Sequence, residues 1–313
     1  MELSFSTTWN AHRVINGKEM IQELMAMGFS TLELNYKVTN EMLQEILPQI
    51  ECGDLMISSI HNVFPKCFDP TYDTDSLLLG YPDQERRKKS IELTKTSIDY
   101  AQFLHAKALV IHPGGIPDSS LWAYNYSLKA LYLTGKRQSK EYATLFQQML
   151  EYRQSHQAYY LDLITDSLVE LGEYIEKKHY SVKLGLENRA NLLDIPDFHE
   201  ISSLCESLSD YPIYAWYDIG HGIILKELGY HQDKDQVNKL KGKILGVHIH
   251  DALGIQDHWA PYTVGNQLDK YLDLIRDIPI RVLELNGRNS MRQVLDGTAI
   301  LLSKLKENID ESV

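Results

Sequence analysis

The sequence predicts an α/β fold: a single (β/α)8 TIM barrel with an aromatic-rich helical insertion after the fourth strand. Three observations support this prediction. The chain has 313 residues, which suits one barrel of ~250 residues with insertions. Short apolar runs recur eight times along it, and stretches with helical spacing lie between them. We therefore expect residues 1–313 to form one domain.

The eight apolar runs have the character of buried parallel strands. Each is short and bounded by glycine, proline or polar residues, which is typical of strands covered on both faces. In chain order the runs are Leu3–Thr8, Phe29–Tyr36, Met56–Val63, Ala108–Gly114, Lys183–Arg189, Ile213–Gly220, Ile244–Asp251 and Arg281–Asn286.

Helical spacing is clearest in the segment Leu161–His179, where apolar residues recur every three or four positions. A weaker version of the pattern covers residues 84–106. Eight repeats of strand and helix favour a closed barrel over a doubly wound open sheet, which usually has fewer strands. No run is followed by G-x-G-x-x-G or G-x-x-x-x-G-K-[ST], so the two common nucleotide-binding fingerprints are absent.

Two connections, residues 64–82 and 116–160, are long for a barrel. Both follow carboxyl ends of strands, the side on which barrel enzymes build their sites. The second is rich in aromatic residues: Trp122, Tyr124, Tyr126, Tyr132, Tyr142, Tyr152, Tyr159 and Tyr160. We expect this insertion to be a lid, a substrate wall or a subunit contact. The alternative is a helical hairpin that only packs on the barrel.

Charge and cysteine content narrow the range of partners and compartments. The 31 basic and 43 acidic residues give a net charge of −12, which disfavours nucleic acid and anionic membranes as partners. Cys52, Cys67 and Cys205 form no C-x-x-C pair, so neither a disulfide framework nor a cysteine zinc site is predicted. A reducing, cytoplasmic location fits best. The sequence shows no pattern of a signal peptide or a membrane span.

Runs three to eight each end in side chains that can bind metal ions. These are His61, His112, Glu187, Asp218 with His221, His248 with His250, and Glu284. Side chains alternate along a strand, so His248 and His250 share a face and Ile249 points away. If those faces point inward, the groups converge at the mouth of the barrel.

Carboxylates and neutral imidazoles together suit Zn²⁺, Mn²⁺, Co²⁺ or Mg²⁺. Without a cation, so many buried carboxylates would repel one another and destabilise the fold. Taken singly, each residue has a simpler explanation. Arg189 would serve as the ion-pair partner of Glu187, and Asp218 would cap the following helix. Six consecutive strand ends of this kind favour a metal site over these separate explanations.

With these motifs the chain resembles the xylose isomerase-like TIM barrel superfamily, which includes sugar isomerases, epimerases and endonuclease IV. The motifs are His61, His112-Pro113-Gly114, Leu186-Glu187-Asn188, Asp218-x-x-His221, His248-x-x-Asp251 and Glu284. The resemblance implies a divalent metal held by Glu187, Asp218, His248 and Glu284. In the isomerase and epimerase branch it also implies that Glu187 and Glu284 move protons at adjacent sugar carbons, and that His221 contacts substrate hydroxyls.

The endonuclease IV branch implies a larger ligand set. There His61 and His112 would hold one zinc with Glu187, and the four residues named above would hold a second. His221, with an aspartate and a histidine after strand seven, would hold a third. In that loop this chain has Asp257 and His258 side by side, whereas the family pattern is Asp-x-His. His258 is therefore the expected ligand, and Asp257 departs from the pattern.

Two functions follow from these observations. The first is a metal-dependent isomerase or epimerase of a sugar or sugar phosphate, with Arg189, His250 and Trp259 joining His221 in substrate binding. The alternative is a multi-zinc phosphoester hydrolase acting on a small phosphodiester rather than DNA, which the extra ligands favour. One to three divalent ions and a small-molecule substrate are expected in either case, and the insertion offers a contact for a homo-oligomer. A barrel that has lost its chemistry fits least, because all these ligand positions are filled.

Overall fold

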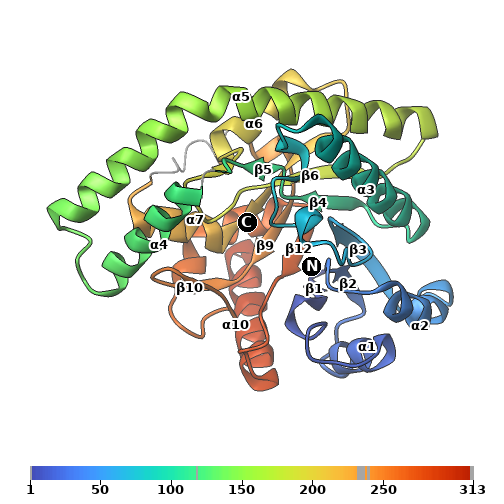
Figure 1. Cartoon of the computed structure of the whole chain (residues 1–313). Helices are drawn as coiled ribbons and strands as arrows, with labels where there is room; N and C mark the ends of the chain where they lie inside the picture. The colour runs from blue at the N-terminus through green and yellow to red at the C-terminus, as the bar shows by residue number, and fades with distance from the viewer. Residues whose placement is uncertain (1, 118, 231–236, 238–239, 311–313) are drawn as a thin grey trace.

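The structure, a computed structural model, describes residues 2–117, 119–230, 237 and 240–310. Its centre is a closed barrel of eight parallel strands, joined in the order β1-β12-β9-β8-β6-β4-β3-β2 (Figure 1). The strands are β1 Ser4–Ser6, β2 Thr31–Leu34, β3 Met56–His61, β4 Ala108–Ile111, β6 Lys183–Glu187, β8 Ile213–Asp218, β9 Ile244–Ile249 and β12 Ile280–Leu283. Seven of the eight predicted runs contain one of these strands completely, and β12 begins at Ile280, one residue before the eighth run. The closed ring confirms the predicted barrel and excludes the open sheet.

Helices surround the ring (Figure 1). They are α1 Gly17–Ala26, α2 Asn40–Glu51, α3 Gln84–Phe103, α4 Ser119–Leu133, α5 Lys140–Lys178, α6 Phe198–Ser207, α7 Ile219–Leu228, α9 Leu272–Asp277 and α10 Met291–Asp310. Polar residues cap several of them: Asn16, Thr39, Asp83 and Asp197 each accept a hydrogen bond from a first-turn amide of α1, α2, α3 and α6. No described helix is long and apolar enough to cross a membrane.

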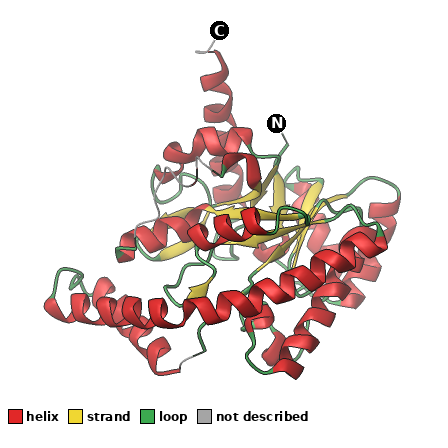
Figure 2. Cartoon of the chain, turned by 90° about the horizontal axis from the view of Figure 1, so that it is seen from above, coloured by secondary structure: helices red, strands yellow, loops and turns green. Residues whose placement is uncertain are grey.

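Helix α5 is longer than the sequence pattern predicts. It begins at Lys140 rather than Leu161, because the Ser139 side chain caps it by accepting a hydrogen bond from the Tyr142 amide. Its 39 residues correspond to a length of ~58 Å, and it crosses the width of the molecule in Figure 2. Residues 116–160 thus contain α4 and the first half of α5. A role as lid or subunit contact stays a prediction.

Polar contacts hold the insertion, residues 116–160, against the rest of the chain. The Tyr132 hydroxyl donates to Glu227 and the Tyr142 hydroxyl to the Leu228 carbonyl, which ties this segment to the end of α7. By contrast, Tyr126 and Tyr159 are exposed. The side chain of Trp122 lies outside the described part of the chain.

A tryptophan fills the interior of the barrel. Trp216 on β8 is fully buried and packs with Ala108, Val110 and Val282. Its neighbours on the adjacent strands are Gly185 and Gly246, where an added Cβ would lie 3.0 Å and 2.2 Å from the indole. Glycine at these two positions therefore makes the space that the indole occupies. We call Gly185, Trp216, Gly246 and Val282 the floor.

Two small antiparallel sheets lie outside the ring. One pairs β5 Gly114–Gly115 with β7 Asp194–Ile195. The other pairs β10 Asp251–Leu253 with β11 Gln256–Trp259. The second hairpin directly follows β9, so it carries Asp257, His258 and Trp259 to the mouth of the barrel.

Candidate metal centre

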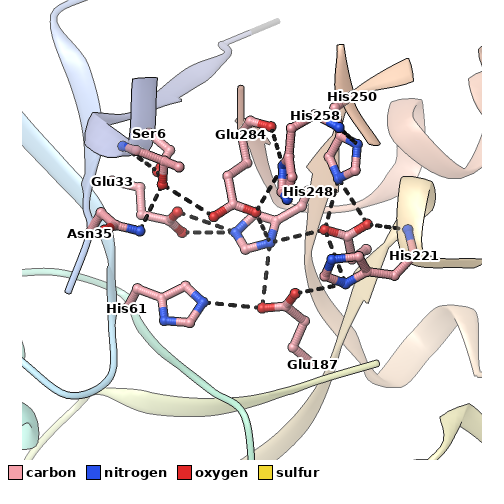
Figure 3. Close-up of polar contacts among 12 residues, drawn as sticks. Ser6, Glu33, Asn35, His61, Glu187, His221, His248, His250, His258 and Glu284 are labelled. Atoms are coloured by element: carbon pink, nitrogen blue, oxygen red, sulfur yellow. Dashed lines mark hydrogen bonds and ion pairs between the residues drawn. The ribbon is translucent and has the colours of Figure 1, made fainter. Parts of the chain in front are cut away.

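Three carboxylates and one imidazole meet at the carboxyl end of the barrel (Figure 3). Glu187, Asp218 and His248 come from β6, β8 and β9, and Glu284 directly follows β12. Each offers a ligand atom, and these atoms all lie within 4.8 Å of one another. We call these four residues the mouth cluster. They stand two positions beyond the four floor residues, so alternation along the strands places both sets on the inner face.

The mouth cluster is closed to solvent: Glu187, Asp218 and His248 are 0% exposed and Glu284 is 5% exposed. Burial alone would raise the pKa values of Glu187 and Asp218, but the neighbouring imidazoles of His112, His221, His248 and His250 lower them well below the usual range. Both groups are therefore held as carboxylates. Three buried carboxylates this close together need positive charge between them.

Glu33 on β2 sets the orientation of the His248 ring. His248 Nε2 lies 3.1 Å and 3.2 Å from the two oxygens of Glu33, and the Ser59 hydroxyl donates to the same carboxylate at 2.8 Å. With Nε2–H donated to Glu33, His248 Nδ1 points into the mouth cluster. There it lies 3.1 Å from Glu284 and 3.6 Å from both Glu187 and Asp218.

A nitrogen surrounded by carboxylate oxygens must bind a proton or a metal cation. Burial alone would lower the pKa of His248, but Glu284, Glu33 and Glu187 raise it well above its ordinary value. The attraction that draws a proton to Nδ1 would also draw a divalent cation. His248 Nδ1 and Glu187 Oε1 are both buried with no hydrogen-bond partner among the described residues. The donor set of the mouth cluster therefore fits a divalent metal.

Four further histidines hydrogen-bond outward through Nδ1. In His61, His112 and His221 the other ring nitrogen, Nε2, faces a carboxylate. The outward acceptors are the backbone carbonyls of Asn62, Asn188 and Glu284 for His61, His221 and His258, and the Asp75 carboxylate for His112. An outward hydrogen bond that fixes ring and tautomer is typical of metal-ligating histidines.

Two of these histidines form a second group with Glu187, which we call the histidine cluster. His61 Nε2 and His112 Nε2 lie 3.2 Å and 3.0 Å from Glu187 Oε2. Arg189 enters the same group, with its Nη1 only 2.6 Å from His112 Nε2 and 3.6 Å from Glu187 Oε1. Its Nη2 donates to Asp75 at 2.7 Å.

A third group, the loop cluster, consists of His221, Asp257 and His258. His221 Nε2 lies 3.8 Å from Asp257 Oδ2. Adjacent residues on a strand usually point to opposite faces. Here His258 has a left-handed φ of 56°, which breaks the alternation and lets both neighbours reach one group. The structure thus places Asp257 beside the expected ligands despite its departure from the Asp-x-His spacing.

His250 is fully buried, and both of its ring nitrogens have partners. Its Nδ1 accepts the His258 amide at 2.9 Å, so its Nε2–H donates to Asp218 at 3.0 Å. The ring packs on Gly220, where an added Cβ would lie 1.9 Å from it. In this arrangement His250 orients Asp218, and both of its nitrogens already have partners. His250 also forms a group with His258 and Glu284 that could hold a metal ion. Its contact with substrate stays a prediction.

Asp218 has two tasks at once. One carboxylate oxygen accepts the His221 amide at 2.7 Å and caps α7. The carboxylate also belongs to the mouth cluster. Asn188 fixes the backbone beside it, since its side chain accepts from the Asp218 amide at 2.8 Å and donates to the Asp218 carbonyl at 3.0 Å. The capping explanation and the metal explanation are therefore compatible.

Trp259 lies on β11 at the edge of the site and is half-buried. The guanidinium of Arg288 stands 4.9 Å from its ring centre. The structure thus gathers all the predicted ligands into three adjoining groups, with Arg189 inside one of them and Trp259 at the margin. Sequence reasoning missed Glu33 and Asp75. A charged residue in the otherwise apolar strand Thr31–Leu34 is a signal for Glu33, whereas no pattern marks Asp75.

The fold and site define a (β/α)8 barrel with clustered carboxylates and imidazoles at the mouth. The family model for the xylose isomerase-like TIM barrel matches residues 21–304, so the chain belongs to that family. Comparison with curated proteins finds no match.

Several solved structures share the fold. A D-tagatose 3-epimerase-like protein has 19% sequence identity over 100% of both chains, with a TM-score of 0.67. The 3-keto-D-glucoside 4-epimerase YcjR from E. coli has 13% identity over 97% of this chain and 99% of its own, with a TM-score of 0.67. The IolI protein with a bound zinc atom has 14% identity over 97% and 99%, with a TM-score of 0.66.

Proposed function

We propose that this protein is a divalent-metal-dependent isomerase or epimerase of a sugar or sugar phosphate. The observation that carries the proposal is the mouth cluster, in which three buried carboxylates surround the inward nitrogen of His248. The family and the similar folds of an epimerase-like protein and of the epimerase YcjR support the reaction class.

Glu187, Asp218, His248 and Glu284 would hold the metal. When bound, a divalent cation polarises a carbonyl and a neighbouring hydroxyl and so makes the adjacent C–H bond more acidic. The identity of the metal is open among Zn²⁺, Mn²⁺, Co²⁺ and Mg²⁺, since oxygen and imidazole ligands accept all four. A zinc atom in the similar fold of IolI favours testing zinc first.

Glu187 and Glu284 would move the protons. Their ligand oxygens lie within 4.8 Å of each other, at the end of β6 and directly after β12, so a substrate between them would have one carboxylate near each of two adjacent carbons. One carboxylate removes a proton from carbon as general base, and the other, once protonated, returns one. Their own hydrogen bonds and their burial hold them in this orientation.

The remaining predicted site residues have supporting roles in this proposal. His221 and Trp259 would contact substrate hydroxyls and the sugar face, and His250 would hold Asp218. The net charge of −12 supports a small-molecule substrate over nucleic acid. Oligomer formation and the cytoplasmic location stay predictions.

Deuterium exchange into a panel of candidate sugars tests the proposal. The purified protein, supplied in turn with Zn²⁺, Mn²⁺, Co²⁺ or Mg²⁺, is incubated in D₂O with pentuloses, hexuloses and their phosphates. Loss of a carbon-bound proton signal in the NMR spectrum reports enolisation. We expect exchange with at least one ketose, and none after chelation. A metal-loaded, folded protein that exchanges no proton in the whole panel would contradict the proposal.

The alternative function is hydrolysis of a small phosphodiester, and the histidine and loop clusters favour it. Several cations together would neutralise a phosphate and activate water. His258→Ala distinguishes the two functions when metal equivalents per chain are counted. Loss of one equivalent, together with zinc-dependent cleavage of bis(p-nitrophenyl) phosphate by the wild type, supports the hydrolase. An unchanged count supports the single-metal isomerase.

A further inference from the structure

The guanidinium of Arg189 stands beside two residues of the histidine cluster. Its Nη1 is 2.6 Å from His112 Nε2 and 3.6 Å from Glu187 Oε1. His112 and Glu187 each offer a ligand atom to a cation in this cluster. The side chain starts two residues after Glu187, so the strand that supplies the shared carboxylate also supplies the guanidinium.

The position of Arg189 beside His112 makes this contact a direct competition. His112 Nδ1 lies 3.0 Å from the Asp75 carboxylate, and its Nε2 lies 2.6 Å from Arg189 Nη1 and 3.0 Å from Glu187 Oε2. A hydrogen bond from Arg189 to Nε2 uses the lone pair of that nitrogen. A metal would need the same lone pair at ~2.1 Å, which cannot coexist with an arginine nitrogen at 2.6 Å.

The histidine cluster and the mouth cluster differ in the number of acidic and basic side chains that the structure describes in each. The histidine cluster contains a single carboxylate, Glu187, and one guanidinium balances it. The mouth cluster contains three carboxylates and no basic side chain other than His248. Asp75 fixes the guanidinium through a 2.7 Å hydrogen bond from Nη2. Arg189 thus forms an ion pair with Asp75 on one side and contacts the Nε2 atom of His112 on the other.

We propose that Arg189 is a built-in occupant of the histidine cluster, which excludes a divalent cation there and confines metal binding to the remaining ligands. This inference rests on the proposed function and deepens it. The chain has the ligands for a multi-metal hydrolase. Arg189 would limit it to the lower number of metal ions that isomerase chemistry needs.

The test is a Co²⁺ titration of the metal-free wild type and of metal-free Arg189→Gln. Calorimetry and visible absorption both monitor the binding. A cavity of about 210 Å³, lined by Asp75, Asn191 and Asp194, adjoins Arg189, so the shorter side chain has room. We expect Arg189→Gln to bind one more equivalent than the wild type. Arg189→Gln should bind this added ion at least ~10-fold more tightly than the wild type binds an ion at the histidine cluster, because a positive charge has been removed.

Lys129→Met is the matched control. Lys129 is a second cation near the mouth, but its ammonium donates to the Asn191 side chain at 2.8 Å rather than to a ligand residue. Its removal changes the charge by the same amount and should leave the Co²⁺ count unchanged. The added equivalent in Arg189→Gln should disappear in the double variant with His61→Ala. His61→Ala alone should bind as many Co²⁺ ions as the wild type.

The outcomes separate this inference from the proposed function. If the wild type and Arg189→Gln bind the same number of ions, or if Lys129→Met also gains one, the role of Arg189 is wrong while the mouth site stands. If His61→Ala alone loses an ion, a metal already occupies the histidine cluster, and the inference is wrong. If no chain binds Co²⁺, both the inference and the proposed metal site fail. Circular dichroism of each variant shows that it is folded.

Discussion

The floor and the mouth cluster stand two residues apart on the same inner face of the barrel, yet their chemistry is opposite. The floor is Trp216 seated against two glycines and a valine, with carbon contacts throughout. The mouth cluster is equally buried, but it consists of three carboxylates and an imidazole. We therefore expect the floor to contribute mainly stability and the mouth cluster to contribute mainly metal binding. Substitutions in the two layers should separate these effects.

The largest effect is expected in the mouth cluster. Glu187→Gln and Glu284→Gln should each lower turnover on the true substrate by at least ~1000-fold, because each removes a proton-transfer group and a metal ligand. Both metal-free variants should still fold, because glutamine keeps the size of the side chain, and should unfold at a somewhat lower temperature, since each loses a carboxylate that neighbouring imidazoles stabilise. Steady-state kinetics and thermal unfolding measure the two effects. Near wild-type activity in either variant would show that the proposed mechanism is wrong.

The next largest effect is expected in the floor, where a substitution should lower the stability of the fold rather than remove a catalytic group. Trp216→Ala should lower the free energy of unfolding by about 3–5 kcal/mol, because it leaves a large cavity in the barrel. Urea unfolding of the metal-free protein measures this loss. Leu295→Ala on α10 is a control, since Leu295 is 41% exposed and should change the stability little. If Trp216→Ala lowered the free energy of unfolding by less than ~1 kcal/mol, the floor would contribute little to the stability of the barrel.

Glu33 on β2 contacts the mouth cluster through His248. Glu33→Gln should weaken metal binding by about 10–100-fold, because the carboxylate that orients His248 and raises its basicity is removed. Calorimetry measures the affinity, and Glu51→Gln on α2 gives the same charge change at an exposed position. Equal affinities in Glu33→Gln and the wild type would exclude this orienting role.

The smallest effect concerns a thiol on the outer side of the floor. Cys205 on α6, a helix packed on the Trp216 strand β8, is 1% exposed, and burial raises the pKa of its thiol to about 12. At pH 8 it is protonated, so iodoacetamide should label Cys52 and Cys67 but not Cys205 in the folded wild type. Mass spectrometry should find labelled Cys205 in Trp216→Ala, where unfolding is more frequent. Rapid labelling in the wild type would contradict this packing.

The sequence was sufficient for the barrel because its strands are local patterns. Seven of the eight apolar runs contain one whole strand and the eighth overlaps β12. The closed ring follows from their number and spacing. The start of α5 was less predictable. The stretch before Leu161 has many tyrosines and polar residues, and the Ser139 cap outweighs its weak apolar pattern.

The site was predictable only where a ligand ends a strand. Glu187, Asp218, His248 and Glu284 do so, and alternation then gives their shared face. Asp75 lies in a long connection, and only the folded chain brings it to His112. The approach of Asp257 to His221 depends on the left-handed φ of His258, which spacing does not reveal. The place of the Arg189 guanidinium likewise depends on its contacts with His112 and Asp75, which only the folded chain brings together.

The most direct test of the central claim is a count of metal equivalents in the unchelated protein, made by elemental analysis of the wild type and Asp218→Asn. The mouth cluster predicts at least one divalent ion per wild-type chain, an unfolding temperature that rises when metal is restored, and loss of both in Asp218→Asn. A wild-type chain that holds no metal, and that no divalent ion stabilises, would contradict the metal centre proposed for this barrel.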